Sequence, residues 1–302
     1  MANVVTPLNS PRALAAEPAA PVGSYRSIGA ILVDSGRLSA EAAERVIRHQ
    51  KANAMRFGDA AVQLGLLTPE DVEQALSSQF DYSYLPADDR SVSPELIAAY
   101  KPFSATVEQL RALRSQLVLR WFDADTDRKV LSVVSPSKGS GASFIAANLA
   151  IVFSQLGEKT VLVDANLRDP RQHLLFRTGS GPGLSNLLLS GQASSDPIVH
   201  LLSFPNLSVL PAGAVPPNPQ ELLGRPVFAD LLARLAKEHD VVLIDAPAAD
   251  GFADAQMVAA RAGAAIMVVR RNKAPVKQIA AVAQQIREAG AVLVGSVLND
   301  GG

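Results

Sequence analysis

The sequence predicts an α/β domain with a mainly parallel sheet between helices, preceded by a small all-helical domain. Two observations support this prediction. After residue 128, short apolar runs rich in β-branched residues alternate with segments of helical pattern, and residues 27–79 contain two copies of a helical repeat. Strands that are apolar throughout indicate a parallel sheet covered on both faces. A chain of 302 residues is long enough for about two domains.

The composition excludes several classes of protein. A hydrophobic content of 48% with 19% charged residues is typical of a chain with a large core, so a disordered or fibrous protein is excluded. The formal net charge of −1 gives no general attraction for nucleic acid or an anionic bilayer, so we expect no nucleic-acid partner. The absence of cysteine excludes disulfides, thiolate metal sites and cysteine nucleophiles.

The N-terminus and the apolar runs bear on location. Residues 1–24 are Ala-rich and interrupted by Pro, without the basic start and apolar segment of a signal peptide, so we expect a disordered tail. The apolar runs are far shorter than the roughly 20 residues that span a bilayer. We therefore expect a cytoplasmic protein with no direct membrane insertion, held at the inner membrane by a partner.

An internal repeat organises residues 25–85. The segment SIGAILVDSGRLSAEAAERVIRHQ returns as RFGDAAVQLGLLTPEDVEQALSSQ, with five residues between the copies. In each copy an apolar segment ends at a Gly suited to a helix C′ position, and a Ser or Thr then caps the next helix. The repeat predicts a compact domain of short helices. The recurring positions are Gly29, Val33, Gly36, Leu38, Glu41, Glu44 and Gln50, which return as Gly58, Val62, Gly65, Leu67, Glu70, Glu73 and Gln79.

Residues 86–128 are predicted to form a linker and a helix, and residues 129–302 the α/β domain. The predicted strands are KVLSVV, KTVLVDA, LSVLPAG, DVVLIDA, AAIMVV and AVLVGSVLN. Helices are expected from Ser143, after Pro170, from Pro219, near Asp254 and from Pro275. Right-handed crossovers place the loops that follow the strands along one edge of the sheet, where ligands bind in α/β proteins.

The loop after the first strand has the composition of a phosphate-binding loop, or P-loop. In Ser135-Pro-Ser-Lys-Gly-Ser-Gly-Ala-Ser143, two glycines let successive backbone N–H groups turn toward a phosphate, and the following helix points its positive end there. In the usual pattern, GxxxxGK[ST], a Lys follows the second Gly and the next hydroxyl binds Mg²⁺. Here Ala142 replaces the Lys, although Ser143 keeps the hydroxyl. The loop alone is equally compatible with a Gly-rich turn that binds nothing.

Two carboxylates favour a ligand at this loop. The second strand ends VLVDANLRDPRQH and a later strand ends VVLIDAPAADGFADA, which brings Asp164 and Asp245 to the same sheet edge. Buried carboxylates need a cation or hydrogen-bond donors to stay ionised, and Mg²⁺ bound through Ser143 would provide a cation. The sequence therefore predicts a P-loop nucleotide-binding domain.

The order of these motifs resembles that of the bacterial tyrosine autokinases of polysaccharide synthesis, relatives of the MinD/ParA ATPases. The segments that carry the resemblance are the P-loop with FIAANLA, the DxDxR-like and IDxP segments, PAGAVPPNPQELL and the terminal VLND, and they cover about residues 103–300. The whole chain looks most like the exosortase-associated, chain-length-determinant kinase of exopolysaccharide operons. The resemblance implies ATP or ADP and Mg²⁺ as cofactors, and a separate membrane chain-length regulator as partner.

The resemblance also implies residue roles. The first Asp of DxDxR assists deprotonation of the acceptor tyrosine, the second helps to hold Mg²⁺, and the IDxP Asp completes the metal shell. Carried over, these positions are Asp164, Asn166 and Asp245, with Arg168 in the Arg position. The implied metal ligands are Ser143, Asp164 and Asp245, and the implied nucleotide-binding residues are Lys138, Gly139, Ser140, Gly141, Ala142, Ser143, Phe144 and, near the adenine, Asn299.

The chain departs from the family pattern at this site. Ala142 replaces the phosphate-binding Lys and Asn166 replaces a carboxylate, so two charges are absent. Lys138, Arg168 and Arg271 are the candidates to compensate. The printed sequence ends VLNDGG where the family carries a tyrosine cluster, so we expect no self-phosphorylated tail of the usual kind.

The predicted helix before the first strand carries a possible subunit contact. Glu108, Arg111 and Arg114 stand at i, i+3 and i+6 and share one broad helix face. The spacing equals the ExxRxxR motif with which these kinases pack into rings, so the resemblance implies a homo-oligomer. The alternative is a solvated charged face.

The front repeat resembles the N-terminal domain of type II secretion and pilus ATPases, in its cyclic-di-GMP-binding variant. An Arg could stack on guanine, and a Gly lets backbone approach a phosphate. The alternative is a docking module whose glycines only end helices. The implied ligand residues are Arg26, Gly29, Gly36, Arg56, Phe57, Gly58 and Gly65.

Three functions remain as hypotheses. The first is an ATP-binding regulator of exopolysaccharide chain length, polymerisation or export that is weak or inactive as a kinase. The second is an active protein-tyrosine autokinase that uses a substitute cation. The third is a ParA-like positioning ATPase, against which the DxDxR-like and PPNPxELL segments argue.

Overall fold

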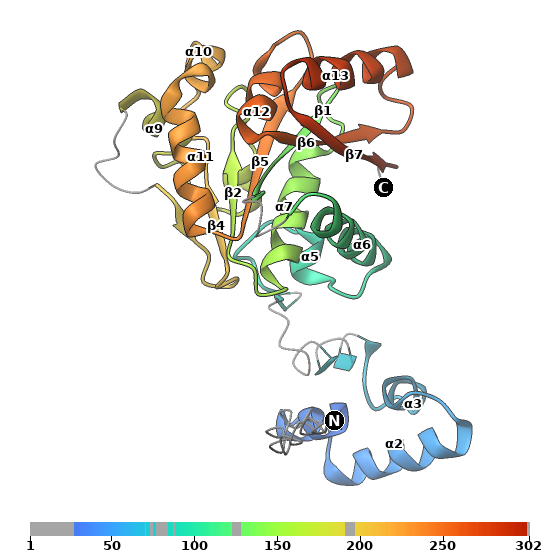
Figure 1. The fold of residues 1–302 in the computed structure, drawn as a ribbon. Coiled ribbons are helices and arrows are strands. Elements are labelled where there is room, and N and C mark those ends of the chain that lie inside the picture. Colours follow the sequence, from blue (N-terminus) through green and yellow to red (C-terminus); the bar gives the residue numbers. More distant parts are fainter. Residues whose placement is uncertain are drawn as a thin grey trace, which may run out of the picture. The chain divides into compact units, whose positions relative to one another are not determined.

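The computed structural model describes residues 27–69, 71–72, 75–76, 84–86, 88–122, 128–190 and 197–300. The chain divides into two compact units, Met1–Phe80 and Asp81–Gly302. The predicted tail at 1–24 and Arg26 lie outside the described residues. The predicted linker at 86–128 belongs to the second unit (Figure 1).

The front unit is helical, as the repeat predicts. Its helices are α1 (Ile28–Asp34), α2 (Ala40–Asn53) and α3 (Phe57–Gln63), and residues 69, 71, 72, 75 and 76 are also helical. The predicted caps are present in both copies. Gly36 and Gly65 have φ of +71° and +65°, and the Ser39 and Thr68 hydroxyls accept the backbone N–H of Ala42 and Asp71.

The second unit contains one seven-stranded sheet with the order β3-β4-β2-β5-β1-β6-β7. All neighbouring pairs are parallel except β3 and β4. The predicted mainly parallel α/β fold is therefore confirmed. The strands are β1 (Val130–Ser135), β2 (Thr160–Asp164), β3 (Val199–His200), β4 (Leu207–Leu210), β5 (Val241–Ala248), β6 (Ala264–Arg270) and β7 (Val292–Asn299).

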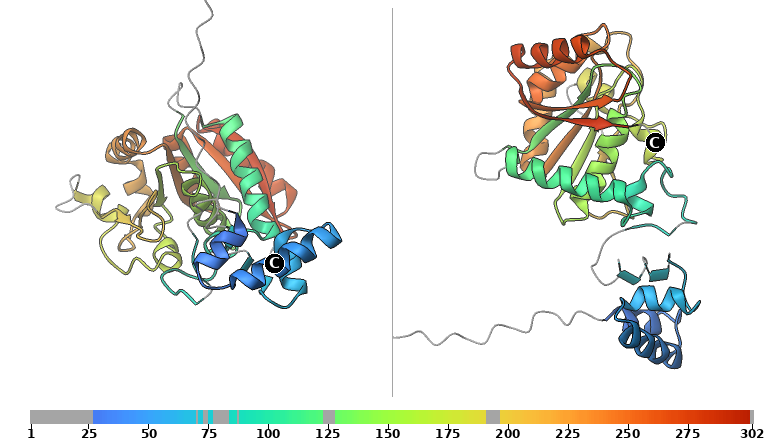
Figure 2. Two further views of the ribbon diagram at one scale, coloured as in Figure 1. Left: turned by 90° about the horizontal axis from the view of Figure 1, so that it is seen from below. Right: turned by 90° about the vertical axis from the view of Figure 1, so that its right-hand side faces the viewer.

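Helices cover both faces of this sheet, as the right-hand view of Figure 2 shows. One face packs against α7 (Ala142–Ser154), α8 (Gln172–Leu175) and α5 (Ile97–Tyr100), with α6 (Ala105–Arg120) packed on α7. The other face packs against α9 (Leu184–Ser190), α10 (Pro219–Gly224), α11 (Pro226–Glu238), α12 (Asp254–Ala262) and α13 (Val276–Glu288). This double cover explains why β1, β2, β4 and β5 are apolar almost throughout.

All six predicted strands are present, and the sequence missed β3 because it has only two residues and pairs antiparallel to β4. It also missed α5 and α9, which have four and seven residues. Such short elements carry too little periodicity to predict. Among the described residues, no helix combines the length and the apolarity needed to cross a bilayer.

Candidate nucleotide and metal site

The loop between β1 and α7 has the backbone shape that a phosphate-binding loop requires. Gly139 and Gly141 have φ of +75° and +92°, which side-chain-bearing residues rarely adopt. Gly141 directly precedes α7, so the positive end of this helix faces the loop. The Ser140 hydroxyl donates to the Ser137 carbonyl at 2.7 Å and holds the turn closed. The predicted nest of inward backbone N–H groups is compatible with these two glycine conformations and stays a prediction.

Residues from the far end of the domain brace this loop. Asn299, at the end of β7, donates its amide to the Ser140 carbonyl at 3.0 Å, and Gln278 on α13 donates to the Pro136 carbonyl at 2.8 Å. A Cβ on Gly141 would lie 2.2 Å from Asn299 Nδ2, so a larger residue here would have to displace the Asn299 amide. Asn299, expected near the adenine, therefore lies directly against the phosphate loop.

The three cations expected to replace the missing Lys are each paired with an acid. Lys138 lies 2.7 Å from Asp169, and Arg271 lies 2.8 Å from Asp300. Arg168 is hydrogen-bonded to the fully buried carboxylate of Asp254, and its guanidinium stacks 3.7 Å over the Phe252 ring. Moving Arg168 to a phosphate would leave the Asp254 charge buried and unpaired, which is costly.

Asp164 and Asp245 stand opposite each other in the parallel register of β2 and β5, and both are fully buried. Asp164 accepts three backbone N–H groups, from Asn166 at 3.2 Å, Arg171 at 3.1 Å and Gln172 at 2.9 Å. These bonds fold the loop after β2 around the carboxylate. Asp164 thus has donors on both oxygens and serves as an anchor of the site.

Asp245 has a different environment. Its Oδ2 accepts the Gln172 side-chain amide at 2.7 Å, and the same amide donates to the Ser143 carbonyl at 3.2 Å. The buried Oδ1 of Asp245 has no hydrogen-bond partner. Gln172 thereby links the loop after β2, the start of α7 and the end of β5, which the sequence did not predict.

Burial raises the pKa of both carboxyl groups. It raises the pKa of Asp164 well above its ordinary value, and the charge of Asp245 raises it further, against the three backbone N–H bonds. Burial raises the pKa of Asp245 to about 6, while the Gln172 amide, the Ser143 hydroxyl and the Arg171 charge oppose this shift. Two buried acids side by side with raised pKa values favour a bound cation.

The residues present fit Mg²⁺. The unpartnered Asp245 oxygen and the nearby Ser143 hydroxyl are the hard oxygen donors that this ion prefers. In the described part of the chain, no three His, Cys, Asp or Glu side chains gather to hold a metal by themselves. Mg²⁺ commonly takes only one or two protein ligands and completes its shell with phosphate oxygens and water. Asn166 instead closes a turn with Asp169, to which its amide donates at 2.8 Å.

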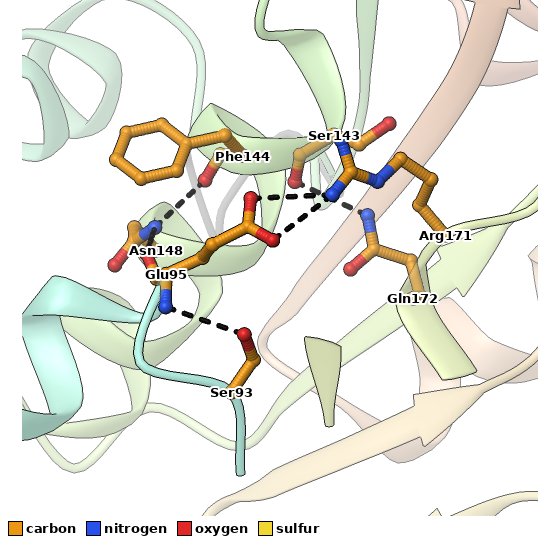
Figure 3. Close-up of polar contacts among 7 residues, drawn as sticks. All are labelled: Ser93, Glu95, Ser143, Phe144, Asn148, Arg171 and Gln172. Atoms are coloured by element: carbon orange, nitrogen blue, oxygen red, sulfur yellow. Dashed lines mark hydrogen bonds and ion pairs between the residues drawn. The ribbon is translucent and has the colours of Figure 1, made fainter. Parts of the chain in front are cut away.

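A cavity of about 900 Å³ opens in front of the loop. The cavity is lined by the loop residues and by Phe144, Arg168, Arg270 and Asn299. Glu95 and Ile97, which precede α6, and Thr106, in its first turn, form another part of the wall. Figure 3 shows the Glu95 carboxylate facing the Arg171 guanidinium at this wall, with Asn148 of α7 beside it. The volume is that of a site for a small organic ligand.

The proposed oligomerisation residues make contacts within the chain. Arg111 is ion-paired with Glu108 one turn earlier on α6, and Arg114 donates to the Val152 carbonyl of α7 at 2.8 Å. Arg114 thus stabilises the carbonyl end of α7. The Glu108 side chain remains 61% exposed.

Two glycines of the front unit are packing glycines. A Cβ on Gly58 would lie 2.4 Å from Val72, and one on Gly29 would lie 3.2 Å from the Phe57 ring. Gly36 and Gly65 face open space at helix ends. Arg56 is exposed at the start of α3. The packing of Gly29 and Gly58 therefore needs no ligand to explain it.

The fold and the site define a P-loop nucleotide-binding protein, and known proteins give its family. Residues 129–296 match the family model of the cellulose biosynthesis protein BcsQ. The putative tyrosine-protein kinase CapB of Staphylococcus aureus is 34% identical over 212 residues, or 69% of this chain and 90% of CapB. Tyrosine-protein kinase YwqD of Bacillus subtilis is 32% identical over 68% of this chain and 85% of its own length. The chain belongs to the bacterial tyrosine autokinase family of capsule and exopolysaccharide export.

Solved structures agree. The kinase domain of Escherichia coli tyrosine kinase Etk matches with a TM-score of 0.64 and 30% identity, over 70% of this chain and 81% of that domain. The chimerical protein CapA2B2 matches with a TM-score of 0.63 and 32% identity, over 75% of this chain and 98% of the chimera. MinD of Pyrococcus horikoshii, complexed with Mg-ADP, shares the fold at a TM-score of 0.50 and 24% identity, over 58% of this chain and 71% of MinD. Of the putative tyrosine-protein kinase EpsB of Ralstonia solanacearum, the chain spans only 32%.

We predict that the site makes the ligand-free protein less stable as pH rises. The pKa of Asp245 is raised from 3.8 to about 6 in the folded chain. Its protonated form therefore stabilises the folded state fully below pH 3.8, and this stabilisation is lost as the pH rises through about 6. The free energy of unfolding without Mg²⁺ or nucleotide should therefore fall by about 1 kcal/mol between pH 5 and pH 7.5. Urea unfolding at the two pH values measures this difference.

Asp245→Asn should reduce this pH dependence and raise stability at pH 7.5, because it removes a buried charge without removing the side chain. Asp230→Asn, at an exposed position on α11, is the matched control and should keep the dependence of the unmodified protein. If the free energy of unfolding changes equally with pH in the unmodified protein and in Asp245→Asn, the Asp245 charge does not destabilise the ligand-free protein.

Proposed function

We propose that this chain is an ATP-binding regulator of exopolysaccharide chain length, polymerisation or export that is weak or inactive as a kinase. One observation carries the proposal. The start of α7 at the phosphate loop and the unpartnered Asp245 oxygen near Ser143 support binding of a magnesium nucleotide, while Ala142 presents only a methyl group where the family has an ammonium. The names of the matched model and relatives, which include cellulose biosynthesis and tyrosine-protein kinase, support the setting.

Nucleotide binding would use groups that are present despite the missing lysine. Backbone N–H groups of the loop and the positive end of α7 would bind the phosphates, and Ser143 and Asp245 would hold Mg²⁺. Bound Mg²⁺ neutralises phosphate charge. Asp164 keeps the loop after β2 in place through its three backbone N–H bonds.

We expect the missing ammonium to lower the rate of phosphoryl transfer more than the affinity for the nucleotide. In phosphoryl transfer the protein contributes mainly positioning and positive charge against the equatorial oxygens. Loss of a single such donor lowers rates by about 10²–10³, or roughly 3–4 kcal/mol, in comparable sites. The pairing of Arg168 with the buried Asp254 argues against compensation by Arg168. Lys138 and Arg271 lie in exposed ion pairs, and this pairing alone does not exclude them. The first alternative is an active autokinase that uses another cation. The second alternative is a ParA-like positioning ATPase, and the similarity of this chain to MinD supports only a common fold.

We further propose that the chain forms a ring and docks on a separate membrane chain-length regulator, as in the exosortase-associated type. The exposed Glu108 at the end of the charged face supports the ring. Similarity to a chimera named CapA2B2 supports pairing with a second protein. The protein would then work in the cytoplasm at the inner membrane.

For the front unit we propose an N-terminal domain like that of type II secretion ATPases. Packing of Gly29 and Gly58 supports a docking module, whereas the exposed Arg56 keeps a cyclic-di-GMP site open. These two functions differ in whether a small ligand binds.

The missing ammonium can be restored. We expect the unmodified protein to bind ATP and ADP in calorimetry with Mg²⁺ and to show little or no tyrosine phosphorylation or ATP hydrolysis. Ala142→Lys should tighten ATP binding, because it adds a charge at the β- and γ-phosphates. Ala142→Lys with Asn166→Asp should raise turnover above either single change, since both charges act on one metal–phosphate unit.

Ala142→Met is the matched control, because it adds comparable length without charge, and it should not tighten binding. Robust autophosphorylation by the unmodified protein that is lost in Asp164→Ala would instead establish a working kinase.

The ring has a test that leaves the fold intact. Replacing Arg114 would remove the bond to the Val152 carbonyl, so the exposed Glu108 is the better target. Glu108→Arg should disperse the oligomer to monomers in light scattering, because it places like charges on the proposed contact. Glu238→Arg, at another exposed ion pair on α11, is the control. An unchanged mass for Glu108→Arg would exclude this face.

The cyclic-di-GMP site has an equally direct test. If the site exists, the full chain should release heat on titration with cyclic di-GMP, and Arg56→Ala should abolish it while Arg48→Ala, an exposed position on α2, should not. If the unmodified chain releases no heat with high micromolar cyclic di-GMP, the front unit is a docking module without this ligand. If Arg56→Ala and Arg48→Ala both bind as well as the unmodified chain, Arg56 is not part of the binding site.

A further inference from the structure

Arg171 is a cation at the nucleotide site that neither the motifs nor their spacing single out. It directly precedes α8, and its backbone N–H is bound to Asp164 at 3.1 Å, so its position relative to the buried carboxylates is fixed. Its side chain lines the same cavity as the phosphate loop. Its charge is close enough to Asp245 to lower the pKa of that carboxyl. Arg171 therefore lies near the metal and phosphate end of the cavity.

The Arg171 guanidinium is held by a carboxylate. One of its terminal nitrogens lies 3.0 Å from Glu95 Oε1 and 3.2 Å from Oε2 (Figure 3). A carboxylate and a phosphate offer the same pair of anionic oxygens to a guanidinium. Glu95 thus occupies a terminal nitrogen of Arg171 that a terminal phosphate could use instead.

Glu95 is itself positioned by the helix that follows the phosphate loop. The buried side chain of Asn148 on α7 donates to the Glu95 carbonyl at 3.2 Å and accepts the Ala98 N–H at 2.9 Å. The Glu95 N–H donates to the Ser93 hydroxyl at 3.3 Å. These bonds fix the backbone of residues 93–98 against α7, while the carboxylate extends into the cavity.

This ion pair differs from that of Arg168, another of the cations that line the cavity. Arg168 pairs with Asp254, which is 0% exposed. The Arg171 and Glu95 side chains are 46% and 49% exposed, so water can solvate either charge when the pair separates. Exposed pairs of this kind contribute little to stability. Arg171 can therefore exchange Glu95 for a ligand, whereas Arg168 cannot without burying a charge.

We propose that Arg171 contributes to the terminal-phosphate subsite of the nucleotide site, without restoring the charge absent at position 142, and that Glu95 occupies this subsite in the nucleotide-free chain. The proposal rests on the nucleotide binding proposed above. The ligand class is a nucleoside triphosphate, because a diphosphate has no third phosphate to compete with Glu95. The subsite makes ATP affinity depend on the position of residues 93–98.

The test is calorimetric titration of the full chain with Mg²⁺ and either ATP or ADP. Arg171→Gln should weaken ATP binding about tenfold, as expected for a charged hydrogen bond, and ADP binding much less. Glu95→Gln should tighten ATP binding about two- to fivefold, because it removes the competing charge and keeps the shape. In the Arg171→Gln background, Glu95→Gln should have no effect on ATP affinity.

Two further variants keep the test decisive. Arg171→Lys retains a positive charge and the backbone N–H, so it should preserve part of the preference for ATP even if Arg171→Gln folds poorly. Arg234→Gln removes an exposed ion-paired Arg on α11 and should leave both affinities unchanged. Equal losses of ATP and ADP affinity in Arg171→Gln, or no gain in Glu95→Gln, would overturn the subsite. Failure of the unmodified protein to bind either nucleotide would overturn the proposed function itself.

Discussion

Two buried carboxylates, Asp164 and Asp245, occupy paired positions on neighbouring parallel strands, and the site is organised around their charge. Asp164 is stabilised by three backbone N–H groups, which fold the loop after β2 back onto the strand end. Asp245 keeps one buried oxygen without a hydrogen bond. Because isolated buried charges are costly, this arrangement is best stabilised by a cation held between protein and ligand.

In the proposed complex, the rest of the domain would place the phosphate end of a nucleotide at this cation. A parallel sheet brings the carboxyl ends of β1, β2 and β5 to one edge, so the loop after β1 and both carboxylates meet there. Gln172 joins them, since its amide bonds both Asp245 and the Ser143 carbonyl. The loss of one ammonium at Ala142 leaves this framework intact. The nucleotide binding proposed above therefore does not depend on that ammonium.

Much of this could be predicted from the sequence, because apolar strands and the ends of parallel strands follow simple rules. The meeting of Asp164 and Asp245 at one edge is such a case. The pairing of charged side chains follows no such rule. From the sequence, Arg168 was a candidate to bind a phosphate, but it pairs with Asp254, which is 86 residues away. Arg171 pairs with Glu95, which is 76 residues away. These contacts depend on how loops cross above the sheet, and no local pattern records them.

A crystal structure of the chain with Mn²⁺ and ADP would show directly whether Asp245 holds the metal, because anomalous scattering locates the ion. We expect a single ion about 2.1 Å from the Asp245 oxygen that now has no partner, with the Ser143 hydroxyl as a second ligand and the phosphates on the backbone N–H groups of Gly139 to Ser143. A metal bound away from Asp245, or ADP bound without contact to this loop, would contradict this expectation.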